Sequence, residues 1–179
     1  MAKPDFTNSN NIIAEMIRVD YAGEYGAKRI YEGQADYSKN YQDSIIINDM
    51  LQQEEVHLRY FTNLLLQRAV RPTILMPFWH IIGYAIGSGS RLLGAKTAML
   101  LTQSVEEVIE QHYQQQINYL EHRKIDQELL DNIKQFQLDE IEHKNTALSQ
   151  GSGETICASS INKIIKLFCK LAINLSKKL

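Results

Sequence analysis

Two short motifs of the form Glu-x-x-His occur far apart in the sequence, and a further glutamate precedes them by 30 and 34 residues respectively. The six residues of this pattern are Glu24, Glu54, His57, Glu106, Glu140 and His143. Each of them falls on an otherwise apolar stripe with helical periodicity. The sequence therefore predicts two helix pairs, each with a single Glu on one helix and a Glu-x-x-His motif on the other.

A carboxylate in a helix-bundle core costs several kcal/mol unless a partner compensates its charge, so four such acids need an explanation. Spacing of three residues places each Glu and His of a motif on one helix face, where both reach one metal ion. One such motif alone is common, but two copies with matched preceding acids are hard to obtain by chance. Four carboxylates and two imidazoles suit two iron or manganese ions, which is the pattern of ferritin-like di-metal bundles.

Several acids next to these positions are expected to play no part in metal binding. Glu55 and Glu142 are expected to face outward or to lie at the boundary of the core. Glu107 competes with Glu106 for the ligand position, but only Glu106 shares a stripe with Thr102, Ile109 and Tyr113. We therefore predict Glu106 as the ligand.

Histidines and a tyrosine outside the pattern have weaker signals. His112 and Tyr113 lie two turns after Glu106, where they are expected to hold a ligand or to line a substrate pocket. For His112, a position at the edge of the core is an equal alternative. His80 and His122 have no acid at ligand spacing and are interpreted as structural or exposed.

Helical periodicity extends over nearly the whole chain and predicts an all-α fold. The expected helices cover residues 10–38, 45–68, 91–121, 126–149 and 155–179. Pro72 and Pro77 interrupt this pattern, and the segment 77–96 is expected to be a short apolar helix that ends in a flexible turn. Its glycines would allow movement or close packing. The prediction is a ferritin-like four-helix bundle with an accessory short apolar helix and a C-terminal amphipathic helix.

Composition agrees with a single domain over residues 1–179, with a flexible N-terminus at 1–9. The chain is 44% hydrophobic and 22% charged, which is typical of a globular protein. Its two cysteines exclude a disulfide framework and a cysteine-based metal site. We find no Gly-rich dinucleotide fingerprint, so no binding site for an organic cofactor is predicted.

Charge is distributed unevenly along the chain. All 21 acidic residues lie at or before Glu154, and residues 155–179 carry five lysines among apolar residues. Residues 56–105 are also free of acids. This pattern favours an anionic bilayer surface over nucleic acid. The last helix is expected either to lie in the membrane surface or to pack on the bundle, and residues 72–90 to enter one leaflet rather than to cross.

Five segments together resemble the Coq7 family over nearly the whole chain. They are IRVDYAGEYGAKRIYEGQ at 17–34, EEVH at 54–57, PFWHIIGYAIG at 77–87, VEEVIEQHY at 105–113 and DEIEHKNTAL at 139–148. The resemblance implies a di-iron monooxygenase of ubiquinone biosynthesis, a 3-demethoxyubiquinol 3-hydroxylase that acts with O₂. It also implies two Fe ions per chain, held by the six residues of the Glu/His pattern. Tyr21 departs from the family pattern, which usually has His at this position.

The resemblance also implies partners and a location. The partners are a polyprenyl demethoxyubiquinol, O₂, an external reductant, the membrane surface and other ubiquinone-biosynthesis proteins, with no nucleic acid. The expected location is peripheral, on the cytoplasmic side of a bacterial cell membrane. The N-terminal sequence shows no transit-peptide pattern, so the matrix side of the mitochondrial inner membrane is the alternative.

Two other functions remain open from the sequence. A ferritin-like ferroxidase or peroxidase would use the same ligands, although the Lys-rich apolar C-terminal helix and the small number of cysteines disfavour it. A non-catalytic membrane-surface helical protein is the second alternative. In such a protein, Arg18, Lys28 or Arg29 would pair with the core acids, and no stoichiometric metal would bind.

Overall fold

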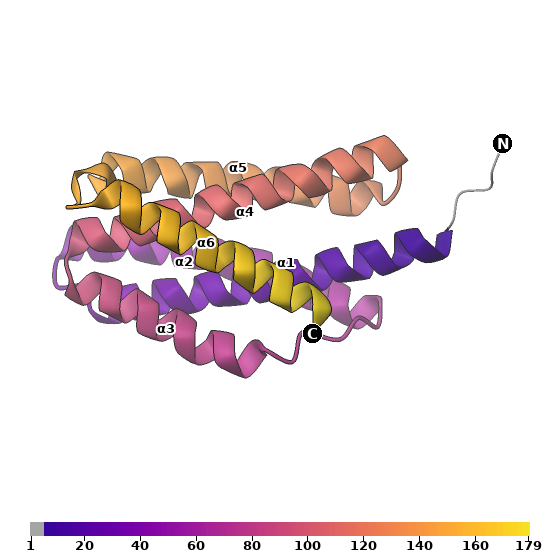
Figure 1. Cartoon of the computed structure of the whole chain (residues 1–179), viewed down its shortest axis with the longest axis horizontal. Coiled ribbons are helices and arrows are strands. Elements are labelled where there is room, and N and C mark those ends of the chain that lie inside the picture. Colours follow the sequence, from indigo (N-terminus) through magenta and orange to yellow (C-terminus); the bar gives the residue numbers. More distant parts are fainter. Residues whose placement is uncertain (1–5) are drawn as a thin grey trace.

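The computed structural model describes residues 6–179, which form six α-helices, one short 3₁₀ turn and no strand (Figure 1). These elements are α1 (Phe6–Asp36), α2 (Tyr41–Gln67), α3 (Met76–Leu92), α4 (Ala95–Arg123), α5 (Gln127–Ser149), η1 (Ser152–Glu154) and α6 (Ala158–Lys178). The prediction of an all-α, ferritin-like helical bundle is confirmed. Of the N-terminus predicted to be flexible, residues 1–5 lie outside the described part and residues 6–9 belong to α1.

The four long helices form two antiparallel pairs, α1 with α2 and α4 with α5. Short connections enforce this arrangement. Asn40 caps α2 by accepting a hydrogen bond from the backbone N–H of Gln42 at 3.0 Å. At the start of α5, Asp126 accepts one from the N–H of Leu129 at 3.4 Å and forms an ion pair with Arg68, the residue that follows α2. This ion pair connects the two halves of the bundle at one end.

The apolar core consists of two clusters with a polar layer between them. One cluster contains Ile17, Phe61, Tyr113 and Ile133, and the other contains Ala27, Met50, Met99 and Ala147. Each long helix contributes to both clusters, and its Glu or Glu-x-x-His residues lie between the two contributions. The apolar contacts above and below therefore fix the four helices at the level where the acids meet.

Helix α3 is longer and more regular than the sequence predicted. It remains helical through Leu92, and α4 begins only at Ala95, four residues later than expected. The reason is close packing of α3 along α1. A Cβ atom at Gly87 would lie 2.0 Å from the carbonyl oxygen of Ile30, and one at Gly83 would lie 2.9 Å from the Cβ of Arg29. The turn after α3 depends on Gly94, whose φ is 125°.

We expect Gly87→Ala to destabilise the fold by about 2 kcal/mol, because the added methyl group forces α3 away from the α1 backbone. Gly89 in the same helix is the matched control, since nothing lies within 4 Å of a Cβ at that position. Gly89→Ala should be neutral or stabilising by about 0.5 kcal/mol through helix propensity. Urea unfolding of both variants measures the difference. Equal stability of the two variants would contradict the packing role of Gly87.

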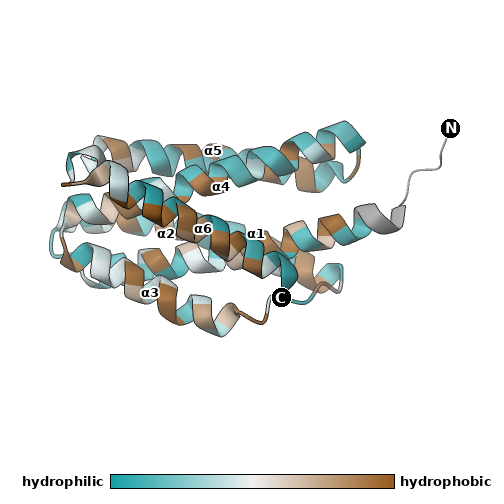
Figure 2. Ribbon diagram, in the orientation of Figure 1, coloured by the Kyte–Doolittle hydropathy of each residue, from teal (hydrophilic) through white to brown (hydrophobic). Residues whose placement is uncertain are grey.

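The C-terminal helix α6 crosses the bundle and contacts α1 and α4 (Figure 1). The indole N–H of Trp79 in α3 donates a hydrogen bond to Ser176 Oγ at 3.2 Å, and Lys166 forms a 2.5 Å ion pair with Glu107 of α4. Leu167 and Leu171 nevertheless remain 71% and 52% exposed. Hydrophobic residues recur along both α6 and α3 (Figure 2). Thus α6 packs on the bundle and still presents an apolar outer edge.

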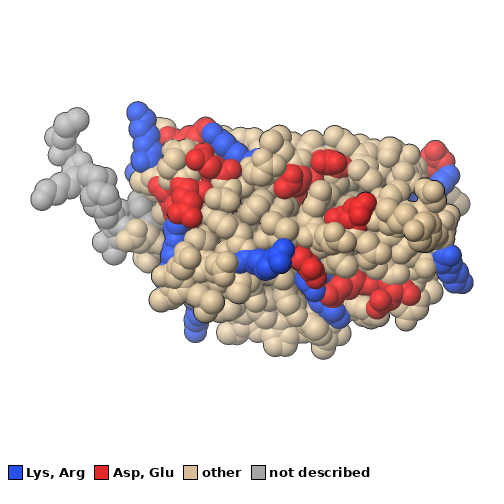
Figure 3. Space-filling model, turned by 180° about the vertical axis from the view of Figure 1, so that it is seen from behind, with Lys and Arg blue, Asp and Glu red and all other residues tan. Residues whose placement is uncertain are grey.

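Within residues 6–179, no helix has the combination of length and apolar character needed to cross a membrane. On the face opposite α6, acidic and basic side chains are interspersed (Figure 3). The sequence of α6 itself contains lysines and no acid. Two of these lysines, Lys166 and Lys177, form ion pairs with Glu107 and Glu15 of the neighbouring helices.

Candidate metal centre

The structure brings the six residues of the Glu/His pattern together in the polar layer of the bundle. Each of them is at most 1% exposed. They form two overlapping groups in which all candidate ligand atoms lie within 4.8 Å of one another. The groups are Glu24, Glu54, His57 and Glu140, and Glu54, Glu106, Glu140 and His143. Glu54 and Glu140 belong to both groups, so their carboxylates are shared between the two groups.

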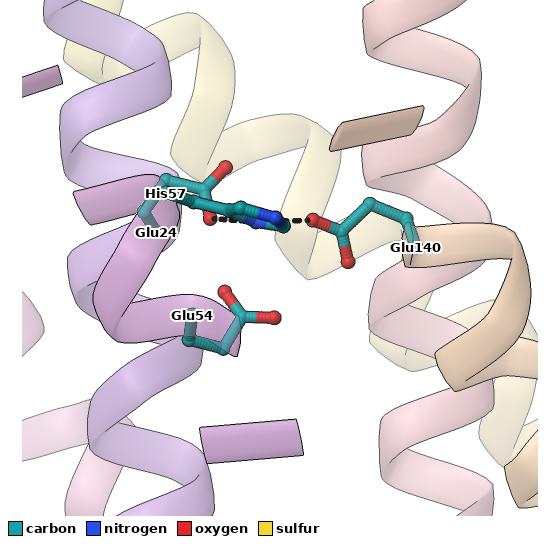
Figure 4. A group of neighbouring side chains, drawn as sticks. All are labelled: Glu24, Glu54, His57 and Glu140. Atoms are coloured by element: carbon teal, nitrogen blue, oxygen red, sulfur yellow. Dashed lines mark ion pairs between the residues drawn. The ribbon is translucent and has the colours of Figure 1, made fainter. Parts of the chain in front are cut away.

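Glu140 lies between the two imidazoles. Its Oε1 is 3.2 Å from His57 Nδ1, and its Oε2 is 3.3 Å from His143 Nδ1. Glu24 Oε2 is 3.3 Å from the same His57 nitrogen (Figure 4). Glu54 Oε1 is correspondingly 3.2 Å from His143 Nδ1. The Nδ1 atom of each histidine thus faces inward toward carboxylate oxygens from two helices.

The atoms that face the centre are buried and have no hydrogen-bond partner. They are Glu24 Oε2, both oxygens of Glu54, Glu106 Oε2, both oxygens of Glu140, His57 Nδ1 and His143 Nδ1. Orphaned buried polar atoms are rare, and eight of them in one polar layer require a compensating group. Carboxylate oxygens and imidazole nitrogens are ligands of iron and manganese. These buried clusters therefore fit bound metal ions.

Outward-facing atoms of the same side chains are held by four hydrogen bonds. Tyr31 Oη donates to Glu106 Oε1 at 2.5 Å, and Tyr113 Oη donates to Glu24 Oε1. His57 Nε2 lies 3.1 Å from Asp139 Oδ2, and His143 Nε2 is bonded to Gln53 Oε1. Such contacts fix the orientation of a ligand and, for histidine, leave the other ring nitrogen available to a metal.

Crowding of carboxylates shifts the proton affinities of the centre. Burial, followed by repulsion from Glu140, raises the pKa values of Glu54 and Glu106 well above the ordinary glutamate value. Burial also acts to raise the pKa of Glu140, but the two adjacent imidazoles lower it to about 2. Burial lowers and the nearby carboxylates raise the pKa of His57, with a net value of about 12. The centre therefore favours bound cations, whether protons or metal ions.

Neighbouring acids behave as expected from their positions in the sequence. Glu107 forms an ion pair with Lys166 of α6, and Glu55 lies 3.3 Å from Lys28. Glu142 is exposed. None of these three carboxylates belongs to either ligand group.

His112 and Tyr113 have different roles. Tyr113 contacts Glu24, whereas His112 Nε2 lies 3.5 Å from Oδ1 of the buried Asp20 and has no hydrogen bond to the six residues among the described contacts. Gln116 donates to Asp20 at 2.7 Å and completes this separate polar group. The alternative position for His112, at the edge of the core, is the one the structure shows.

The other two histidines, and the tyrosine that departs from the family pattern, lie away from the six candidate ligands. His80 Nδ1 is 2.6 Å from Tyr25 Oη and exposed, and His122 is exposed as well. Tyr21 stacks on Tyr25 with ring centroids 6.4 Å apart and packs against the cluster around Ile17. Among the contacts of residues 6–179, Tyr21 has no hydrogen bond to any of the six candidate ligands.

An apolar cavity of about 310 Å³ lies beside the centre, between α1, α3, α4 and α6. Its wall includes Ala27 and Ile109, which lie one helical turn after Glu24 and Glu106 on the same helix faces. Trp79, Phe168 and Ala172 line its side toward α3 and α6. The cavity can therefore accept an apolar molecule close to the ligand groups.

Comparison with known sequences identifies the family. The family described as "Ubiquinone biosynthesis protein COQ7" matches residues 11–176. The chain belongs to the Coq7 family. The matched range includes all six residues of the Glu/His pattern and every residue that lines the cavity.

Relatives within the Coq7 family come from animals, fungi and bacteria. "NADPH-dependent 3-demethoxyubiquinone 3-hydroxylase, mitochondrial" of Bos taurus is 41% identical over 169 residues, covering 93% of this chain and 78% of the relative. "3-demethoxyubiquinol 3-hydroxylase" of Rhodospirillum rubrum is 39% identical over 168 residues, covering 93% and 78%. "5-demethoxyubiquinone hydroxylase, mitochondrial" of Saccharomyces cerevisiae is 35% identical over 173 residues, covering 88% and 74%.

Three residues of this Coq7-family centre were missed by reasoning from the sequence. Gln53 and Asp139 directly precede Glu54 and Glu140, so the repeated pattern contained a signal for them. Tyr31 lies on the same helical stripe as Glu24, where an aromatic residue is ordinarily interpreted as core. Its hydrogen bond to Glu106 of another helix is visible only in the fold.

Proposed function

We propose that this Coq7-family chain is a di-iron monooxygenase that hydroxylates the ring of a demethoxyubiquinol with O₂. The observation that carries the proposal is the pair of buried, overlapping ligand groups with an apolar cavity whose wall begins one helical turn from Glu24 and Glu106. The printed names of the relatives, which are demethoxyubiquinone or demethoxyubiquinol hydroxylases, supply the substrate class. Iron oxidation alone would need the ligand groups but not the apolar cavity.

Each metal ion would have a terminal glutamate and a histidine of its own. Glu24 and His57 would hold one ion, Glu106 and His143 the other, and Glu54 and Glu140 would bridge them. Two divalent ions neutralise the four carboxylates, which removes the cost of burying them. When bound, a di-iron centre supplies the two-electron reduction of O₂ that ring hydroxylation requires.

The protein itself would orient the ligands, exclude water and place the substrate ring. Tyr31 and Tyr113 fix the carboxylates of Glu106 and Glu24 by donating hydrogen bonds to their outward oxygens. The cavity offers almost exclusively apolar side chains, so a quinol ring and the first part of a polyprenyl tail would displace little bound water. Close approach to Ala27 and Ile109 would bring the ring within about one helical turn of Glu24 and Glu106.

The remainder of a long polyprenyl tail would leave the cavity toward α3 and α6. Exposed apolar side chains of both helices border this side, among them Phe78, Ile81, Leu171 and Leu175. Lysines of α6 flank them, as at a helix that lies in an anionic bilayer surface. We therefore propose that this face rests on the membrane and that the chain is a peripheral membrane protein. The relatives from Bos taurus and Saccharomyces cerevisiae carry "mitochondrial" in their names, which supports the mitochondrial inner membrane, the alternative of the two expected locations.

Electrons would come from outside the chain. The sequence contains no dinucleotide fingerprint, and "NADPH-dependent" in the name of the Bos taurus relative points to a nicotinamide donor for that protein. An external reductase, a free nicotinamide or the quinol itself would serve as the electron donor.

The test is quinone analysis in two settings. Purified chain, loaded with ferrous iron and given reductant, O₂ and a demethoxyubiquinol, should release a product that has gained one oxygen atom from O₂. Cells that lack the gene should accumulate the demethoxy quinone. Iron binding with rapid oxidation of Fe²⁺ but no hydroxylated product would move the function to the ferroxidase alternative. No stoichiometric metal would favour the non-catalytic alternative.

A further inference from the structure

The two halves of the centre differ in the group that holds each histidine. His57 Nε2 is hydrogen-bonded to the carboxylate of Asp139, and His143 Nε2 is hydrogen-bonded to the amide oxygen of Gln53. We propose that this difference makes the two metal positions unequal, so that the position at His57 binds a divalent ion first and more tightly than the position at His143. The proposal rests on the di-metal function proposed above and concerns the order in which the two metal positions bind their ions.

The polar contacts of the two histidines are otherwise similar, although the Phe136 ring lies 4.1 Å from the His57 ring and Tyr31 makes an edge contact with His143 at 6.0 Å. Each Nδ1 faces two carboxylates at 3.2 to 3.3 Å. Each terminal glutamate accepts a tyrosine hydroxyl, and both bridging glutamates are shared by the two groups. The residue that holds each histidine also occupies an equivalent place, directly before the Glu of the opposite motif. The exchange of Asp139 for Gln53 is therefore the difference in acceptor charge between the two positions.

The direction of the hydrogen bonds follows from the geometry. A histidine that binds a metal through Nδ1 carries its proton on Nε2, so Nε2 must donate outward. Gln53 can accept this hydrogen bond only through its amide oxygen, which is neutral. Asp139 accepts with a carboxylate, whose second oxygen is 3.2 Å from the amide nitrogen of Gln135. This second contact holds the Asp139 carboxylate in place.

A carboxylate acceptor strengthens a metal–imidazole bond in two ways. It draws the Nε2 proton toward itself, which makes Nδ1 a stronger base, and it adds a negative charge close to the cation. Loss of such a partner typically lowers metal affinity by about 10–100-fold. We expect a difference of the same size between the two positions of this chain.

Manganese is a suitable probe because it prefers the same ligands as ferrous iron and does not oxidise readily. Calorimetric titration of the metal-free chain with Mn²⁺ should show two steps whose affinities differ by about 10–100-fold. Crystals grown with one Mn²⁺ per chain should show anomalous scattering chiefly between Glu24, His57 and Glu140. Two equal half-occupied positions would overturn the proposal while leaving the proposed function intact. Absence of any binding would overturn both.

Isosteric substitutions provide the decisive comparison. Asp139→Asn gives both histidines an amide acceptor and should merge the two steps into one of the weaker affinity. Gln53→Glu gives both a carboxylate and should strengthen the second step by about tenfold. The second variant keeps Asp139, so it tests the proposal even where the first fails to fold. Unchanged affinities in Gln53→Glu, with the two wild-type steps still separate, would contradict the role of the acceptor charge.

Discussion

Replacement of Glu140 by glutamine should lower the rate of hydroxylation by about a thousandfold or more. Glu140 is the carboxylate that faces both imidazoles and belongs to both ligand groups. An amide has no negative charge and only one oxygen, so it cannot bridge two cations in the same way. The measurement is product formation at equal protein concentration, together with the iron content of the purified variant.

Glu142→Gln is the matched control, because Glu142 lies two residues later on the same helix and is exposed. It removes the same charge from α5 and should leave both activity and iron content unchanged. Circular dichroism should show that both variants retain the helical content of the parent. Activity of Glu140→Gln within tenfold of the parent would remove the residue from the catalytic centre.

Blocking the apolar cavity should have the second-largest effect. Ala172 of α6 lines the cavity, and Ala172→Trp would place an indole in a space of about 310 Å³. We expect kcat/KM for the demethoxyubiquinol to decrease by about a hundredfold, because the ring can no longer reach the centre. Iron content should stay the same, since Ala172 belongs to neither ligand group. Steady-state kinetics and metal analysis of the same preparation separate the two effects.

Leu171→Trp is the control for this variant. Leu171 is the preceding residue and is 52% exposed on the outer edge of α6. The same indole at this position leaves the cavity open, so kcat/KM measured with a short-tailed, water-soluble quinol should remain close to that of the parent. Equal kcat/KM values for the two tryptophan variants would mean that the substrate binds elsewhere.

The residues of the centre could be predicted because they are acids and histidines on helical stripes whose other residues are mostly apolar. Acids and histidines on an apolar helical stripe are costly in a core, so the sequence alone marks each of them as unusual. The repetition of the pattern linked Glu24 to Glu54 and Glu106 to Glu140. The four long helices followed from the same stripes, with boundaries that differ from the observed ones by a few residues.

Other features depend on contacts between segments that are distant in the sequence, and these contacts produce no periodic pattern of residues. Gly83 and Gly87 are compatible with flexibility or with close packing, and the structure shows that they let α3 approach α1. Tyr31 reaches Glu106 across the bundle, and this contact becomes apparent only once the helices are placed. Similarly, the two expectations for α6, bundle or membrane, could not be separated by sequence because both use the same apolar residues. The structure places one side of α6 on the cavity and leaves another side exposed.

The most direct test of the account is the number of iron ions that one chain binds. Purified, metal-free chain should be loaded with Fe²⁺ under anaerobic conditions, freed of excess metal and analysed for iron and protein. Two overlapping ligand groups predict about two ions per chain for the parent and far less for Glu140→Gln. A parent chain that retains no iron, or a Glu140→Gln variant that retains as much as the parent, would contradict the metal centre on which the proposed function depends.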